Sequence, residues 1–304
     1  MRYLILVISI LSVTFVGAAQ PKPGYRAEVE AWRSNHEAEI KAEDGWLTVV
    51  GLFWLKEGKN TIGSGADYDV QLTDNFKNGK FGEIELRRGK GTLTLADNVA
   101  ATFDGRPVRS VELVTDDNGR SKPVAFGSQS FFLIKRGERY AVRLRDAESE
   151  GRRQFRRLNW FAIDPKLRVT AKFERYPKPR DVLIPNVLGG TFKMTAPGLL
   201  KFRLNGQLIT LEPVEEDNDL FIIFRDTTSK TTTYGAGRFL YADKPTGDTV
   251  ILDFNKAENP PCAFTAFATC PLPPQRNRLQ IAINGGEKRY YPPDGKRGAE
   301  PGDK

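Results

Sequence analysis

The first regular pattern of apolar and polar positions lies in residues 25–41. The apolar positions fall at the spacing of one helical face and are Tyr25, Val29, Trp32 and Ile40. This spacing, with charged residues between the apolar ones, predicts an amphipathic helix that packs on another part of the protein. His36 lies on the same face, one turn after Trp32. A packing or interface role is favoured for it over catalysis, because no Ser, Cys or Asp motif stands beside it.

After Gly45 the pattern changes to short alternating runs that are broken by Gly, Asn and Asp, which is typical of β-strands. The strands expected in the first half are residues 46–55, 60–62, 70–72, 82–87, 92–95, 101–103, 108–113, 131–136 and 140–145. So many short strands in sequence predict a β-sandwich.

A second β-rich block begins near residue 155. Its expected strands are residues 167–175, 191–194, 199–204, 207–213, 220–224, 238–241 and 250–254. Asn205 and Gly206 separate two apolar runs and give the strongest hairpin signal, since both tolerate the left-handed conformations of a type I′ turn. The predicted fold class is therefore mainly β: an N-terminal amphipathic helix, then a β-sandwich, then a second β-rich domain that is a sandwich or barrel-like.

The two ends of the chain have their own patterns. Residues 1–19 are typical of a secretory signal peptide, with a basic residue, an apolar run that ends at Val16, and small side chains at Gly17 and Ala19 before the cleavage point. The apolar run is short for a bilayer-spanning helix, which needs about 20 residues, so cleavage is favoured over an uncleaved anchor. We expect an exported protein, periplasmic or extracellular, that is not an integral membrane protein after cleavage.

The length of 304 residues fits two domains of about 100 to 200 residues each. The expected segments are the N-terminal helix in residues 20–45, the β-sandwich domain in 46–150, the second β domain in 151–291 and a tail in 292–304. The tail is expected to be disordered because it has no large apolar residue to anchor it.

Composition limits the chemistry that the chain can carry. The single histidine excludes sites that need two imidazoles, such as HExxH metallopeptidases and multi-histidine metal sites, and we expect no metal and no cofactor. The motifs GxSxG, GxxxxGK[ST] and GxGxxG are absent. The net charge is +8, which in an exported protein favours anionic polymers or lipid headgroups over nucleic acid. The densest basic cluster comprises Arg152, Arg153, Arg156 and Arg157. A solvated face is favoured for it over a partner surface.

Residues 55–72, with the sequence LKEGKNTIGSGADYDVQL, precede GEIELRRGKGTLTLAD in 82–97 and FDGRPV in 103–108. This arrangement of turns and strands resembles a forkhead-associated domain, and the resemblance implies a β-sandwich. Phosphopeptide readers of that family carry an arginine right after the glycine and a later Ser-x-x-His. This chain has Ser64 after Gly63 and no histidine in that stretch. The departure implies that phosphothreonine binding is lost and that the domain is a scaffold.

Three further motifs lie along most of the chain. They are WLTVVGLFWL in residues 46–55, YGAGRFL in 234–240, and the elements DFN, NPPCAF, CPLPP and NRL in 253–279. Together they are similar to the bacterial and archaeal family DUF1684, with the resemblance running from about residue 30 to residue 286. Since that family is uncharacterised, the resemblance implies a shared two-part architecture and no particular reaction.

Polar residues gather at strand ends and in tight loops of the second half, where a rigid sheet can hold them toward a cleft. The candidate ligand-binding residues are Asp226, Tyr234, Arg238, Asp253, Asn255 and Asn259. They can bind a sugar or a small anionic ligand, and two converging carboxylates can act as an acid/base pair. The alternative is structural, with side-chain hydrogen bonds that tie loops and a buried ion pair between Arg238 and Asp253.

Cys262 and Cys270 enclose a proline-rich loop. In an exported protein they are expected to form a disulfide. A catalytic thiol is disfavoured because the only histidine is far away in the sequence, and a metal site is disfavoured because it needs four ligands.

Three functions remain open at this point. The first is an exported protein that binds a small polar ligand in the second β domain without turnover. The alternative is a cofactor-free hydrolase of an envelope or extracellular substrate, with Asp253 or Asp226 as the general base. The third is an interaction scaffold that uses the sandwich and the basic cluster. The sequence decides neither whether the protein is an enzyme nor its oligomeric state.

Overall fold

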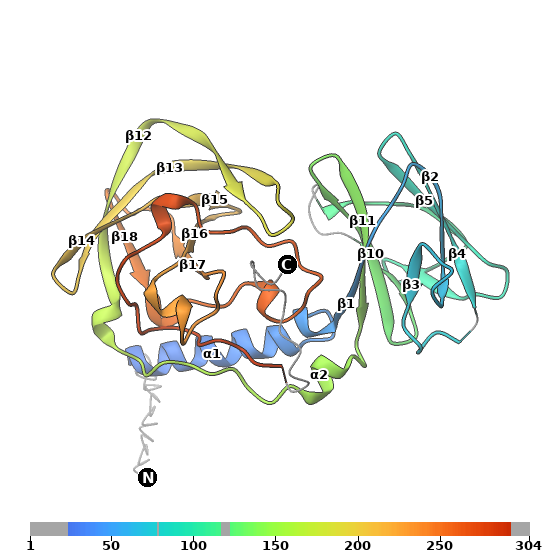
Figure 1. The fold of residues 1–304 in the computed structure, drawn as a ribbon, viewed down its shortest axis with the longest axis horizontal. Coiled ribbons are helices and arrows are strands. Elements are labelled where there is room, and N and C mark those ends of the chain that lie inside the picture. Colours follow the sequence, from blue (N-terminus) through green and yellow to red (C-terminus); the bar gives the residue numbers. More distant parts are fainter. Residues whose placement is uncertain (1–23, 78, 117–121, 293–304) are drawn as a thin grey trace, which may run out of the picture.

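The computed structural model describes residues 24–77, 79–116 and 122–292. The expected signal peptide and, apart from Pro292, the expected tail lie outside this described part. Figure 1 shows two lobes side by side, with the helix α1 (Tyr25–Lys41) running along one edge of the left-hand lobe. No helix among the described residues has the length and apolar character that crossing a bilayer requires.

The right-hand lobe is a two-sheet β-sandwich (Figure 1). One sheet has the strand order β1-β11-β10-β9-β6-β7 and the other the order β3-β2-β4-β5-β8. The strands are β1 (Val49–Trp54), β2 (Gly58–Ser64), β3 (Val70–Leu72), β4 (Lys80–Arg87), β5 (Lys90–Leu95), β6 (Ala101–Phe103), β7 (Arg106–Val108), β8 (Ser110–Leu113), β9 (Val124–Phe126), β10 (Gln129–Arg136) and β11 (Arg139–Asp146). Alternate side chains, such as Leu93 and Leu95 of β5, point into a core between the sheets that is centred on Phe81 and Phe131.

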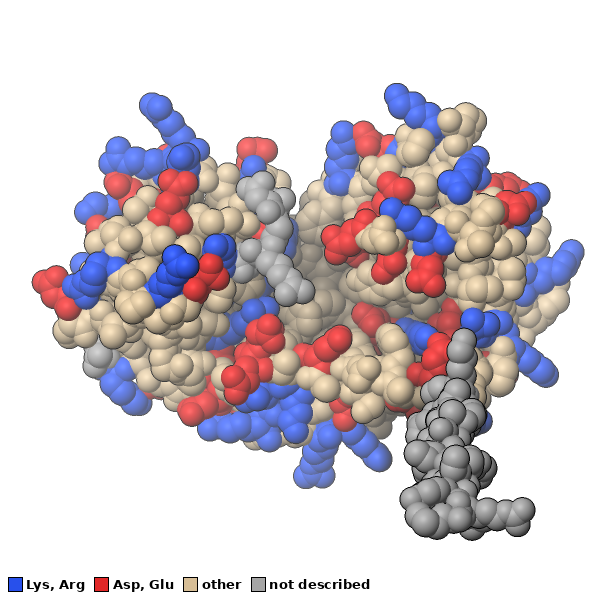
Figure 2. All heavy atoms as spheres, turned by 180° about the vertical axis from the view of Figure 1, so that it is seen from behind, with Lys and Arg blue, Asp and Glu red and all other residues tan. Residues whose placement is uncertain are grey.

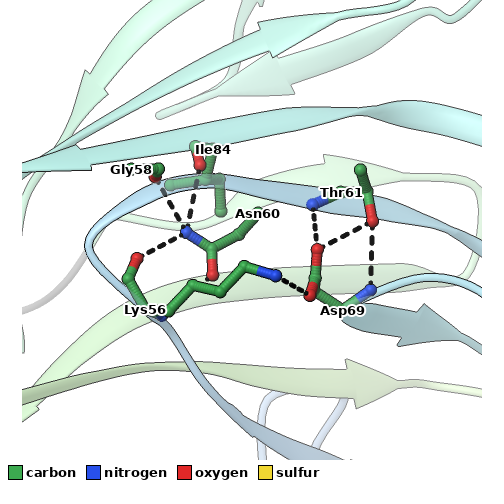
Figure 3. A network of polar contacts seen from close by, with 6 residues as sticks. All are labelled: Lys56, Gly58, Asn60, Thr61, Asp69 and Ile84. Carbon is green, nitrogen blue, oxygen red and sulfur yellow. Dashed lines mark hydrogen bonds and ion pairs between the residues drawn. The ribbon is translucent and has the colours of Figure 1, made fainter.

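A network of polar contacts secures the turn between β1 and β2 (Figure 3). The buried Asn60 side chain donates to the carbonyls of Lys56 and Gly58 at 2.8 and 3.0 Å and accepts from the Lys56 N–H. The Asp69 carboxylate accepts from Lys56 Nζ at 2.7 Å and from both the N–H and the hydroxyl of Thr61. These bonds hold the pKa of Asp69 down at about 2, with the Lys56 bond contributing most. The polar groups of Asn60, Thr61 and Asp69 therefore stabilise this turn.

The left-hand lobe contains a second, barrel-like arrangement of strands. Its two sheets have the orders β14-β13-β12-β18 and β15-β16-β17. The strands are β12 (Arg168–Pro185), β13 (Thr191–Leu204), β14 (Gln207–Leu211), β15 (Val214–Glu216), β16 (Asp219–Phe224), β17 (Arg238–Asp243) and β18 (Thr249–Asp253). Because β17 lies against β18 and β15 against β13, both sheets enclose one core, to which Phe173, Ile222 and Leu252 contribute. The expected mainly β fold, with an N-terminal helix and two β-rich parts, is confirmed.

The hairpin of β12 and β13 is longer than the sequence pattern predicts. The expected strands stop at residue 175 and leave a gap at residues 195–198, because Pro177, Pro179 and Pro197 interrupt the pattern. The structure accommodates these prolines in a register shift of the pairing between Arg175 and Arg180. A bulge frees prolines from ladder hydrogen bonds that they cannot donate. The predicted turn at Asn205-Gly206 joins β13 to β14, and both residues have positive φ, as a type I′ turn requires.

The helix α1 packs on the second lobe, although it precedes the sandwich in the sequence. Tyr25 Oη donates to Asp253 Oδ1 at 2.9 Å, and Lys256 pairs with Glu28 at 2.7 Å. After α1, the expected strand at residues 46–48 is wrong: this stretch is the short helix η1 (Trp46–Thr48), closed by a bond from the Thr48 hydroxyl to the Gly45 carbonyl. Strand β1 then enters the sandwich, so the second lobe contains residues from both ends of the described chain.

The basic cluster lies where the chain leaves the sandwich. Arg152 belongs to the short helix α2 (Glu150–Gln154) and donates to the carbonyls of Lys41 and Ala147, each at 2.8 Å. At least this arginine therefore ties α2 to the end of α1, and the use of the cluster as a partner surface stays a prediction.

Candidate functional site

A cleft at the junction of the lobes holds two adjoining cavities. The helix cavity, of about 630 Å³, lies between the segment 32–46 and the second lobe, and the strand cavity, of about 500 Å³, lies between the second lobe and the sandwich. The residues common to both linings are Trp46, Tyr241, Glu258 and Pro261. Figure 2 shows the surface hollowed between the lobes. Because the linings come from α1, the sandwich and the second lobe, the cleft exists only when all three are folded together.

His36 faces the helix cavity from α1. Its ring stacks on Trp32 at a centroid distance of 5.3 Å, and Trp160 meets it edge-on at 6.0 Å. Nδ1 lies 3.3 Å from Glu258 Oε2, and Nε2 lies 3.5 Å from Glu287 Oε2. Burial alone lowers the pKa of His36, but the carboxylates of Glu287 and Glu258 outweigh it and raise the pKa. Besides its contacts with the two tryptophan rings, His36 therefore has two acidic partners, Glu258 and Glu287.

Glu258 stands at the junction of the two cavities. Its N–H and carbonyl pair with those of Phe239, each bond being 2.9 Å, so strand β17 fixes its position. Burial raises the pKa of Glu258 to about 7; His36 opposes this shift, whereas Glu287 and Glu39 add to it. A carboxyl group with such a pKa can accept or release a proton near neutral pH.

Glu287 and Asn259 form the floor beside this pair. The fully buried Glu287 carboxylate accepts from the Asn259 N–H at 2.9 Å and from Asn259 Nδ2 at 2.6 Å. These bonds fix the Asn259 amide at the wall of the helix cavity. Asn259 is thus both tied to the fold and available to the cleft.

Arg143 of β11 lies on the sandwich side of the strand cavity and is only 4% exposed. Its guanidinium lies over the Trp46 ring at 5.2 Å, and one of its amino groups lies 3.4 Å from the Thr269 hydroxyl. Among the described residues no carboxylate lies within ion-pair distance of Arg143, whereas the neighbouring Arg136 pairs with Asp116 at 2.8 Å. Burial, and then the charge of Arg136, lower the pKa of Arg143 to about 10. A buried cation without a counter-ion is costly, so this position fits an anionic group of a ligand.

The opposite wall of the strand cavity carries an acid and an aromatic ring. Tyr241 of β17 stacks on Phe221 at a centroid distance of 4.8 Å. Burial raises the pKa of Glu216 of β15, and its neighbour Tyr241 opposes this shift by hydrogen bonding. The lining of the strand cavity thus offers a cation from the sandwich, a carboxyl group from β15, and the rings of Trp46 and Tyr241.

Three buried polar atoms in the linings of the two cavities have no hydrogen-bond partner within the described part of the chain. They are Asn259 Oδ1, Arg143 Nε and Glu216 Oε2. Buried polar atoms in folded proteins are nearly always bonded, and water or another small molecule in the cavities can complete the bonding of these atoms.

Asp226 and Arg238, two of the residues predicted to bind ligand, form a buried ion pair outside the cleft. Asp226 Oδ2 accepts from an Arg238 amino group at 2.8 Å, and Oδ1 accepts from the Thr228 N–H at 2.8 Å. Arg238 also donates to the carbonyls of Ile283 and Gly285. The ion pair suggested between Arg238 and Asp253 is therefore wrong, because Asp226 occupies the guanidinium.

Asp253 belongs to a separate network. Its carboxylate accepts from Tyr25 Oη at 2.9 Å and from the N–H of Asn255 at 3.1 Å, and the Asn255 amide also donates to the Asp164 carbonyl. Asp226 and Asp253 thus have different hydrogen-bond partners. Of the six residues predicted to bind ligand, only Asn259 lines either cavity of the cleft.

The loop from Cys262 to Cys270 contributes residues 268–270 to the lining of the strand cavity. The two cysteines are paired as a disulfide with a Cα–Cα distance of 6.2 Å. Tyr234 Oη donates to the Cys262 carbonyl at 3.1 Å, so this predicted residue supports the loop.

Sequence reasoning missed five residues of the cleft: Arg143, Glu216, Tyr241, Glu258 and Glu287. One signal was present, since Glu258 directly precedes Asn259 in the NPPC motif. The others lie in ordinary strand patterns or near the C-terminus. Only Arg143 belongs to the sandwich, so it alone joins the other four through the packing of the two lobes.

Comparison with known proteins finds a family match for the second lobe. The family described as "Protein of unknown function (DUF1684)" matches residues 153–288, so the motif at 46–55 lies outside the matched segment. An uncharacterised protein from gene locus rrnAC0354 of Haloarcula marismortui, solved by NMR, is 32% identical over 45% of this chain and 78% of its own, with a TM-score of 0.39. The forkhead-associated structure Rv0020c_FHA is 20% identical over 32% of this chain and 92% of its own, with a TM-score of 0.21. A search of curated proteins finds no match. From the matched segment and the identity to the Haloarcula protein, we conclude that the chain belongs to the DUF1684 family.

Proposed function

We propose that the protein binds a small polar ligand in the cleft between its lobes, without turnover, and that the ligand carries one anionic group and one flat or apolar face. The site differs from the one expected within the second domain alone, because the sandwich contributes Arg143 and α1 contributes His36. The observation that carries the proposal is the set of unbonded buried polar atoms in the cavity linings.

The chemistry of the walls defines the ligand class. Arg143 is buried without a carboxylate partner in the described part, which suits a carboxylate or phosphate of the ligand. Trp46 and Tyr241 offer ring faces for an apolar or planar portion. Glu216 and Glu258 offer acceptors, or donors when protonated, for hydroxyl or amine groups. A small sugar acid, or a small zwitterionic compound with an apolar face, has this combination of groups.

The test is a thermal-shift screen of the oxidised protein against glycans, peptidoglycan fragments, carboxylates and nucleotides, followed by calorimetric titration of any compound that stabilises it. Arg143→Gln removes the buried charge from the cavity. The matched control is Arg145→Gln, since Arg145 lies on the same face of β11 and packs over Phe132 at 4.8 Å but lines neither cavity.

The expected result is a compound that binds the wild type and the Arg145 variant alike and binds the Arg143 variant at least about tenfold more weakly. If no compound in the screen stabilises the protein, or if the two variants bind equally well, the cleft is not the site that we propose.

A second candidate function is supported by one specific observation, the pKa of about 7 at Glu258. A carboxyl group of this kind, 3.3 Å from a histidine, can act as a general base toward water. This hydrolase would use Glu258 in place of the predicted Asp226 or Asp253. It predicts turnover of a p-nitrophenyl ester, glycoside or phosphate that depends on a group titrating near pH 7 and is abolished by Glu258→Gln. Absence of turnover across that panel favours the binding protein.

Export remains part of the proposal. It is supported by the signal-like sequence of residues 1–19 and by the Cys262–Cys270 disulfide, which is consistent with an oxidising compartment. Fractionation of cells that express the full-length chain, with N-terminal sequencing of the product, tests both the compartment and cleavage after Ala19.

A further inference from the structure

A third cavity, of about 420 Å³, lies in the second lobe and differs from the cleft in its charge. Its lining residues are Arg225, Ser229, Lys230, Gly235, Ala236, Leu272, Pro273, Arg278 and Arg289. Four of them are cations and none is Asp or Glu. We call this the basic pocket, and it shares no lining residue with the helix and strand cavities.

The backbone brings the cations together. Arg225 and Arg278 are paired in a parallel β-bridge: the N–H of Leu279 donates to the Arg225 carbonyl at 2.7 Å. Arg289 is held in place because its guanidinium donates to the carbonyls of Thr233 and Ser229 at 3.2 and 3.3 Å. Lys230 and Arg278 are exposed and Arg225 is half-buried, so the pocket presents a concentration of positive charge that attracts anions from solution.

Two observations distinguish the basic pocket from an ordinary basic surface. Arg225, Lys230 and Arg278 form no ion pair with any residue that the structure describes, although many exposed cations of this chain do. Ser229, which is 2% exposed, has a buried hydroxyl without a hydrogen-bond partner among the described residues. A buried hydroxyl beside unpaired cations lacks an acceptor, and an oxyanion supplies one.

We propose that the basic pocket binds a tetrahedral oxyanion of the phosphate type. Arg225, Arg278 and Lys230 supply the charge, and the hydroxyl of Ser229 donates to one oxygen. A phosphate group presents acceptors in several directions and favours charge-assisted bonds from arginine. Free orthophosphate and the phosphate ester of a larger molecule share this chemistry.

The test is calorimetric titration of the full oxidised chain with sodium phosphate, with glycerol phosphate as an ester and with sodium chloride as the ionic control. Arg225→Gln and Ser229→Ala change the basic pocket. The matched control is Arg276→Gln, because Arg276 lies two residues from Arg278 but faces Glu212 at 3.9 Å. Arg143→Gln reports on any binding in the cleft.

We expect saturable phosphate binding that weakens at least about tenfold in the Arg225 and Ser229 variants and is unchanged in the Arg276 and Arg143 variants. Tighter binding of glycerol phosphate than of orthophosphate identifies an ester as the ligand, and the reverse order identifies the free ion. Ser229→Ala is not expected to lower the melting temperature in phosphate-free buffer, since its hydroxyl has no partner to lose. Absence of saturable binding, or loss of binding in Arg143→Gln alone, overturns the proposal.

Discussion

Replacement of Asp226 by Asn tests the assignment of the Asp226–Arg238 pair to the fold. The side chains of Arg238 and Asp226 are 1% and 0% exposed, and the ion-pair distance is 2.8 Å. Asn retains the size of Asp but removes its charge, which leaves the Arg238 guanidinium buried without a counter-ion. Breaking a buried pair in this way costs about 3 to 5 kcal/mol. In a lobe of this size that corresponds to a fall in melting temperature of roughly 6 to 20 °C.

The matched control is Asp181→Asn, which makes the same chemical change in an ion pair of nearly equal length. Asp181 lies 2.7 Å from Lys193, but their side chains are 59% and 69% exposed. Exposed pairs contribute about 1 kcal/mol or less, so the control should unfold almost as the wild type does. Urea titrations followed by circular dichroism give both free energies of unfolding. A loss below about 1 kcal/mol in Asp226→Asn would refute the structural assignment and restore Asp226 as a free carboxylate of a binding site.

Three other predictions concern the cleft wall and its supports. Because the pKa of Glu258 is raised to about 7, the folded protein keeps a proton that the unfolded chain releases, so the free energy of unfolding should fall by up to about 3 kcal/mol between pH 4.5 and 7. Urea titrations should show a flatter pH dependence in Glu258→Gln, and equal slopes would contradict this. Gly237 has a φ of +114° and an added Cβ would lie 2.5 Å from the Phe224 carbonyl oxygen, so Gly237→Ala should cost at least about 3 kcal/mol. Gly206→Ala, also at positive φ but in open space, should cost only about 1 kcal/mol, and similar losses would show that the close contact is unimportant. Reduction of the Cys262–Cys270 disulfide should lower stability by about 2 to 3 kcal/mol, and two free thiols in the oxidised, unfolded protein would disprove the pairing.

The fold was largely predictable because its signals are local. Alternation in β5 and the Asn205-Gly206 turn depend on neighbouring residues, and both predict the observed structure. The second half of β12 was missed because its prolines are compatible with a strand only through the register shift opposite β13. The packing of α1 on the second lobe was not predictable either, since its apolar face shows that it docks but not where.

The candidate site was less predictable, for a related reason. The sequence drew attention to polar residues in motifs, and several of these, such as Asp226 and Asp253, cap short helices and bond to backbone groups. The polar residues of these motifs therefore indicated loops that are held by many hydrogen bonds. The cleft instead uses residues from ordinary strands, and Arg143 becomes unusual only because it is buried after folding with no carboxylate of the described residues within ion-pair distance.

The segment that matches the family contains only part of the cleft lining. Residues 153–288 include Glu216, Tyr241 and Glu258, whereas His36 and Arg143 lie before the matched segment. The acidic wall of the cleft thus belongs to the part that defines the family, and the buried cation comes from the sandwich. If the anionic group of the ligand is recognised as we propose, the full chain with Arg143→Gln keeps the Cys loop and the acidic wall but loses the charge that selects the ligand. Binding of the same compound by this variant, with undiminished affinity, would show that the cation of the sandwich takes no part in recognition.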